Sequence, residues 1–161
     1  MSKRWLRYLL PGILLAALVI TFVWMQLPQS FGKVIGFDEN CAFYAQSGDV
    51  ESIREVRNSP PEQAAMEPLP ASLKDCTLRR WGYRRTIDPA PGESVYFLRV
   101  HAYSPDKEWM GEVPVVLRSG GMLYKPFGKE GYLWYGISNR DIGAVREDLK
   151  ALRALWSMTG A

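Results

Sequence analysis

Residues that ligate metals or act as nucleophiles are scarce in this sequence. Its 161 residues include one histidine and two cysteines, which are too few for the ligand sets of structural zinc sites. The motifs G-x-S-x-G, H-E-x-x-H and the Walker phosphate loop are also absent. We therefore expect no metal, no cofactor and no catalytic residue, and a protein that is not an enzyme.

Charge is missing from residues 8–32, and the centre of this stretch reads LLPGILLAALVITFVWMQL. About 20 helical residues at 1.5 Å each match the hydrocarbon core of a bilayer, about 30 Å thick. We predict a transmembrane helix over residues 8–28, preceded by a basic tail at 1–7 and followed by a linker at 29–37. The membrane is thus one expected partner.

A cleaved signal peptide is the main alternative for this segment, because it also begins with basic residues. The apolar run is longer than the usual 7–15 residues of a signal peptide, and no A-x-A-like cleavage site follows it. Ser30-Phe31-Gly32 is a weak small-x-small candidate. The retained anchor is favoured and the signal peptide stays open.

The charges that flank the apolar segment predict its orientation. Lys3, Arg4 and Arg7 precede it, whereas Lys33 alone follows closely. The more basic end of a span stays in the cytoplasm, so the domain at 38–161 is expected on the other side. The sequence has more Arg than Lys and no usable N-glycosylation sequon, both compatible with a bacterial inner membrane and a periplasmic domain.

Excess charge is also absent from the predicted domain. The net charge of +3 equals the contribution of the three basic residues in the N-terminal tail. A nonspecific nucleic-acid binder needs a surplus of basic residues to neutralise phosphates. We therefore expect no nucleic-acid partner.

The two cysteines, Cys41 and Cys76, both follow the predicted membrane span. An even number of cysteines in an oxidising compartment favours a disulfide. The bond would close a loop of about 36 residues and contribute about 4 kcal/mol on a chain-entropy model. It would also fasten the proline-rich segment 58–72, which we expect to be an irregular loop.

The pattern after the linker predicts an α+β domain. Residues 38–57 are expected to form two short helices, since Asp38 and Asp49 are typical N-cap residues. Five segments rich in β-branched and aromatic residues then follow, at 77–87, 95–103, 113–117, 122–125 and 132–137. Short turn-forming intervals separate them, so we predict an antiparallel meander of four to five strands.

A C-terminal amphipathic helix completes the predicted domain. Ser138 and Asp141 have the spacing of a capping box, and apolar residues then recur on one helical face. Such a helix buries its apolar face against a sheet.

Arginine and aromatic residues mark a candidate interaction surface. Strand alternation would place Arg79, Trp81, Tyr83 and Arg85 on one face, and residues of these types are common at binding hot spots. We also include Arg99, on a neighbouring strand, and Phe127, at a turn. The alternative is a solvated sheet face with cross-strand ion pairs.

The sole histidine, His101, is expected on the mixed or solvent-facing side of its strand. Val95, Phe97, Arg99 and Tyr103 share that side, whereas the alternate residues of the strand form the apolar side. An ordinary sheet-surface role is favoured over a general base or a pH sensor.

Three functions are compatible with these features. The leading hypothesis is a single-pass envelope protein whose exported domain binds another envelope protein, as an accessory or assembly subunit of a membrane complex. The second is a periplasmic inhibitor or immunity-type protein. The third is a small hydrolase or ligand-binding domain, with Ser72 and Lys74 as one conceivable dyad.

Overall fold

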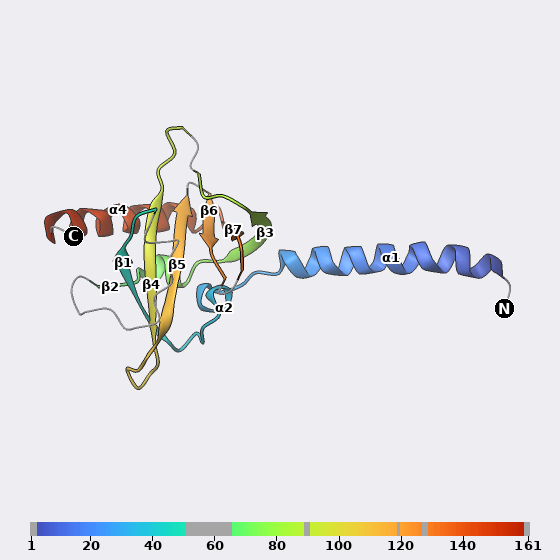
Figure 1. Ribbon diagram of the computed structural model, residues 1–161, viewed down its shortest axis with the longest axis horizontal. Helices are drawn as coiled ribbons and strands as arrows, with labels where there is room; N and C mark the ends of the chain where they lie inside the picture. Colours follow the sequence, from blue (N-terminus) through green and yellow to red (C-terminus); the bar gives the residue numbers. More distant parts are fainter. Residues whose placement is uncertain (1–2, 51–65, 89–90, 119, 127–128, 160–161) are drawn as a thin grey trace.

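Helix α1 (Lys3–Gln26) projects away from the rest of the molecule (Figure 1). The computed structural model describes residues 3–50, 66–88, 91–118, 120–126 and 129–159. Within α1, the segment Leu9–Gln26 is long and apolar enough to cross a membrane, and none of it is buried by the domain. An exposed apolar helix at the N-terminus is a membrane anchor or a signal sequence, since water disfavours such a surface.

The described residues of the domain form one seven-stranded antiparallel sheet with the strand order β2-β1-β4-β5-β6-β7-β3. Its strands, in chain order, are β1 (Ala42–Ser47), β2 (Glu67–Pro68), β3 (Leu78–Arg84), β4 (Tyr96–Tyr103), β5 (Trp109–Arg118), β6 (Gly121–Tyr124) and β7 (Tyr132–Ile137). Strands β4 to β7 are neighbours in both sequence and space, which is the predicted meander. Strand β3 pairs with β7 and forms one edge of the sheet.

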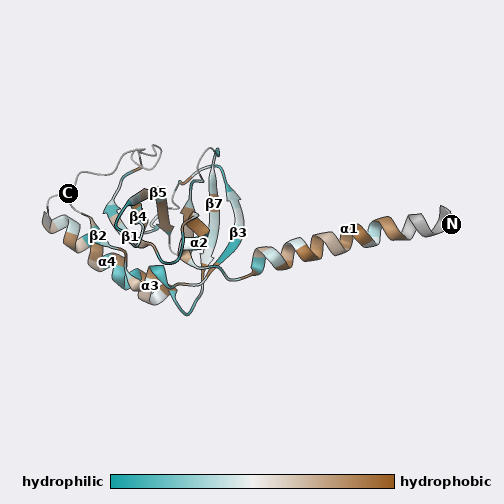
Figure 2. Cartoon of the chain, turned by 90° about the horizontal axis from the view of Figure 1, so that it is seen from below, coloured by the Kyte–Doolittle hydropathy of each residue, from teal (hydrophilic) through white to brown (hydrophobic). Residues whose placement is uncertain are grey.

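In the part of the chain that the structure describes, three helices cover one face of the sheet: α2 (Phe31–Ile35), α3 (Ala71–Lys74) and α4 (Ile142–Thr159). Figure 2 shows α3 and α4 on the same side of the strands. Helix α4 contributes the buried residues Val145, Leu149, Leu152 and Trp156, which recur at helical spacing. The predicted α+β class, antiparallel sheet and terminal amphipathic helix are therefore confirmed, although the sheet has more strands than expected.

The predicted helices at 38–57 are wrong where the structure describes this segment. Residues 42–47 form β1, whose Phe43 and Ala45 face the core while Tyr44 is only half-buried. Asp38 does not cap a helix: its Oδ1 accepts a hydrogen bond of 2.8 Å from the Asn40 amide, as in an Asx turn. Residues 51–57 lie outside the described residues.

The predicted disulfide is also wrong, because Cys41 and Cys76 are free thiols. Both are buried in the core between the sheet and its helices. Burial raises the pKa of the Cys76 thiol to about 12, and the negative charges of Asp141 and Asp75 add to this. A buried free cysteine behaves as a small apolar side chain, so Cys41 and Cys76 contribute packing rather than a covalent bond.

The proline-rich segment 58–72 is irregular only in part. Residues 58–65 lie outside the described residues, Glu67–Pro68 pairs with β1 as β2, and helix α3 begins at Ala71. The Ser72 hydroxyl donates a hydrogen bond to Asp148 of α4. Ser72 thus joins two helices, a structural contact that the hypothesis of a Ser72–Lys74 dyad did not include.

Candidate functional site

The face of the sheet that α2, α3 and α4 do not cover, which we call the second face, contains a buried ion pair. Arg99 Nη1 donates to Glu112 Oε1 at 2.7 Å, and both side chains are almost fully buried. His101 lies directly opposite Glu112 in the β4–β5 ladder, with 3.8 Å between Nδ1 and Oε2. The expectation that His101 faces solvent is therefore wrong, since its exposed fraction is 0%.

Arg99 does not join the arginine and aromatic residues of β3. Three strands, β5, β6 and β7, separate β4 from β3 in the sheet. Both strands are predicted from the sequence, but the prediction that they are neighbours is wrong. Because Arg99 is also buried against Glu112, it is not available as part of an exposed surface.

A β-bulge between Arg80 and Gly82 changes which residues of β3 share a face. The bulge inserts one extra residue and reverses the alternation beyond it. Trp81 packs against Trp134, with 5.7 Å between ring centroids, and the Arg84 guanidinium lies 4.8 Å above the same ring. Tyr83 instead pairs with Leu133, whose side chain packs on the opposite, helix-covered face.

The predicted set of Arg79, Trp81, Tyr83 and Arg85 is thus divided by the bulge. Trp81 and Tyr83 are each about half exposed, at 55% and 54%, and Arg79 and Arg85 are exposed as well. Trp81 lies over Gly136, where an added Cβ would clash with the indole ring. Phe127, the remaining member of the predicted surface, lies outside the described residues.

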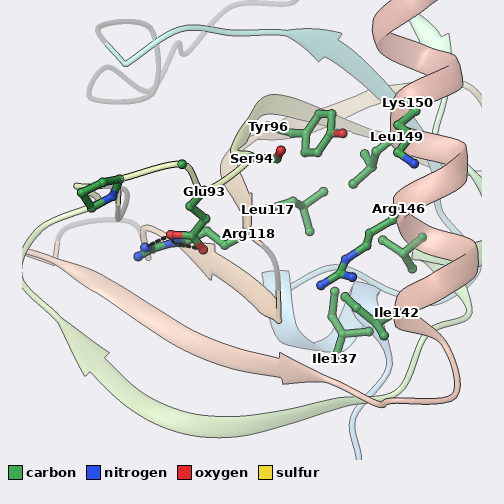
Figure 3. Close-up of a pocket in the computed structure, with 13 residues that line it drawn as sticks. Glu93, Ser94, Tyr96, Leu117, Arg118, Ile137, Ile142, Arg146, Leu149 and Lys150 are labelled. Carbon is green, nitrogen blue, oxygen red and sulfur yellow. Dashed lines mark hydrogen bonds and ion pairs between the residues drawn. The ribbon is translucent and has the colours of Figure 1, made fainter.

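A cavity of about 660 Å³ lies between the first half of α4 and the strands beside it (Figure 3). Its floor is apolar and includes Leu117, Ile137 and Leu149. Arg146 and Lys150 approach it from α4. The cavity is open to solvent along one side, so we call it the α4 groove.

The wall opposite α4 is held by a buried ion pair. Arg118 Nε donates to both carboxylate oxygens of Glu93 at 3.0 Å, and Arg118 Nη2 makes a further contact with Oε2. Arg118 also lies 5.8 Å from the centroid of the Trp134 ring. Because a fork-like arginine–carboxylate pair fixes geometry, it fastens the segment before β4 to the end of β5.

The α4 groove has a basic rim. Lys150 and Arg146 are one turn apart on α4, and Lys150 Nζ donates to Glu147 Oε1 at 2.7 Å. This hydrogen bond and the Glu147 charge raise the pKa of Lys150. The site can therefore receive an apolar group on its floor and a negative charge at its edge.

Comparison with protein-family models, curated protein sequences and solved structures finds no match to this chain. The described residues contain no group of three or more His, Cys, Asp or Glu that could hold a metal ion.

The α4 groove is not predicted from the sequence. Arg146 and Lys150 had a detectable signal, since their i, i+4 spacing places them on one face of the predicted terminal helix beside Leu149. The opposite wall had no such signal, because nothing in the sequence shows that Glu93 and Ser94 lie beside the first half of that helix.

Proposed function

We propose that this protein is a single-pass protein of a bacterial inner membrane, with its N-terminus in the cytoplasm and its domain in the periplasm. The exposed apolar surface of α1 and the basic residues Lys3, Arg4 and Arg7 before it support this arrangement. The domain binds another envelope protein, as an accessory or assembly subunit of a membrane complex.

The observation that carries the proposal is the α4 groove, where an apolar floor meets a basic rim. An extended or helical segment of a partner can place an apolar side chain against Tyr96 and Ile142, which line the groove and are only partly buried, and a carboxylate beside Arg146 or Lys150. Residues that dominate binding energy at protein interfaces are enriched in Arg and aromatic types and lie in well-packed pockets near the interface centre. The partner chemistry that fits is therefore a segment with both apolar and acidic residues.

Site-specific photo-crosslinking in native membranes tests this proposal. A photoreactive residue at Ser94 or Lys150, on the two walls of the groove, should give the same crosslinked partner. Arg153 is the matched control position, because it is exposed on α4 but does not line the groove. Equal adducts at all three positions, or none in the groove, would contradict the proposal.

Charge-reversal variants test whether the basic residues at the rim of the groove bind the partner, as opposed to the positive charge of α4 in general. The variants Arg146→Glu and Lys150→Glu should each reduce the crosslinked fraction about tenfold, since repulsion replaces an attraction at the interface. The matched variant Arg153→Glu should leave it unchanged. A partner that is captured equally by all variants must bind elsewhere on the domain.

A further inference from the structure

A second cavity, of about 400 Å³, lies where the apolar helix joins the domain. After α1 ends at Gln26, the chain pairs with the first residue of β3: the Gln29 amide donates to the Leu78 carbonyl at 2.9 Å, and the Leu78 amide donates back at 3.0 Å. Figures 1 and 2 both show β3 as the strand closest to α1. The junction is thus a defined structure, which we call the junction cavity.

The junction cavity is positively charged. Arg80 and Lys33 line it, and none of the described residues that line it is acidic. Arg80 forms no ion pair with a carboxylate of the described residues. Its Nε is buried without a hydrogen-bond partner among them, although a buried donor is normally paired.

The groups beside Arg80 do not neutralise it. The hydroxyls of Tyr124 and Tyr135 are close enough for the Arg80 charge to lower their pKa values, but burial raises these pKa values by more. Both phenols therefore stay neutral at physiological pH. Tyr135 and Gln29, which also line the cavity, have groups that can donate hydrogen bonds to a bound anion.

The remaining wall of the junction cavity is apolar and comes from the last turn of α1 and the residue that follows the helix. Trp24 and Met25, at the end of the segment that is long enough to cross a membrane, line it together with Leu27. Tryptophan is enriched at the level of the lipid headgroups. One side of the cavity thus matches an anion, and the other matches the apolar part of a lipid.

We propose that the junction cavity binds the headgroup phosphate of a membrane phospholipid, with Arg80 and Lys33 as its cationic ligands. This inference rests on the membrane anchoring proposed above, but not on the partner protein. A free phosphate ion has the same anionic chemistry but would gain nothing from the apolar wall, so lipid and phosphate give different results in the test.

Native mass spectrometry of the full-length protein in mild detergent provides this test, with phosphatidylglycerol, phosphatidylcholine and inorganic phosphate as separate probes. The wild-type protein should retain one phospholipid per chain, and inorganic phosphate at the same concentration should not displace it. Arg80→Gln should weaken lipid retention about tenfold, which corresponds to one lost charge-assisted hydrogen bond. Lys33→Gln should weaken it less, because Lys33 is more exposed.

Arg79→Gln is the matched control, since Arg79 is an exposed neighbour that does not line the cavity. Equal losses in the Arg79 and Arg80 variants would overturn the proposal in favour of diffuse attraction to lipid. Binding of inorganic phosphate without lipid would overturn the assignment to a phospholipid.

Two further measurements keep folding and anchoring apart from lipid binding. If Arg80→Gln lowers the melting temperature, Arg80→Lys and Lys33→Gln replace it in the test, and unchanged lipid retention in both would contradict the proposal. Membrane fractionation shows whether a variant is still anchored. A variant that stays in the membrane and still crosslinks its partner, but has lost the lipid, separates this site from the proposed function.

Discussion

The two faces of the sheet are buried in different ways. The face under α2, α3 and α4 is almost entirely apolar, with Leu98, Val100 and Leu117 at its centre. The other face combines a small apolar cluster around Val116 and Leu123 with buried charges. The hydrophobic pattern of the sequence is therefore enough to predict the first face. The burial of the second face depends on which charged residues become neighbours when the strands pair.

The largest expected effect comes from breaking the buried ion pair on the second face. Glu112→Ala leaves the Arg99 guanidinium without its carboxylate, which contacts it at 2.7 Å. Removing one partner of such a pair costs about 4 kcal/mol of unfolding free energy. Urea unfolding in mild detergent measures the change. A loss below about 1 kcal/mol would show that the pair is not buried as described.

The apolar face should respond through cavity formation instead. Leu98→Ala removes a fully buried side chain of β4, and we expect a loss of about 3 kcal/mol. The same unfolding experiment compares it with Glu112→Ala.

The double variant Arg99→Leu/Glu112→Leu should be more stable than Glu112→Ala, because replacing a whole buried ion pair with apolar residues is often tolerated. The same unfolding experiment measures its stability. A double variant as unstable as Glu112→Ala would contradict the assignment of that loss to an uncompensated buried charge.

Cys76 supplies a pH-dependent prediction for the apolar face. Its pKa is about 12 in the folded state, above the ordinary value of 9.0, so the unfolded state loses this proton first. Above about pH 9 the unfolded state therefore binds fewer protons, and stability falls as the pH rises toward 12. Cys76→Ala should show a smaller fall in melting temperature over this range.

Thiol labelling gives an independent measure of the same burial. Cys76 should react with a maleimide at neutral pH only after unfolding, because the thiolate is the reactive form. The matched variants Cys41→Ala and Cys76→Ala assign any labelling to one thiol. Rapid labelling of Cys76 in the native protein would contradict its placement in the core.

The smallest expected effect concerns the exposed edge of the second face. Arg84→Ala removes a guanidinium that lies 4.8 Å from the Trp134 ring centroid. A cation–π contact at an exposed site contributes about 0.5–1 kcal/mol. Arg85→Ala is the matched control, since that residue follows β3 and is also exposed. Equal losses of unfolding free energy in the two variants would show that the Arg84–Trp134 contact does not stabilise the domain.

The sequence predicted the apolar helix, the β4–β7 strands and the amphipathic helix α4 because each has a strong local period. Strand β1 was not predicted, because Asp38 resembles a helix N-cap residue. The strand is stabilised by pairing with β4, which is far away in the sequence and leaves no local signal. The burial of His101 and the separation of Arg99 from β3 depend on strand order, which alternation within one strand does not determine.

The candidate sites were less predictable than the fold. The bulge at Trp81 changed the composition of the β3 face, and no local signal marks a bulge that forms only through pairing with β7. The α4 groove and the junction cavity each bring together distant segments, such as Ser94 with Lys150 and Trp24 with Arg80. Such sites arise from packing between distant segments, so the local sequence pattern can indicate the residues on one wall but not which segment forms the other.

The proposed membrane topology is tested most directly by adding protease to spheroplasts that express the chain with a tag before Met1 and a second tag after Ala161. A retained anchor predicts a membrane-bound full-length protein that loses its C-terminal tag to external protease, while the N-terminal tag stays protected until lysis. A soluble product without its N-terminal tag, or a C-terminal tag that is protected in intact spheroplasts, would contradict the account.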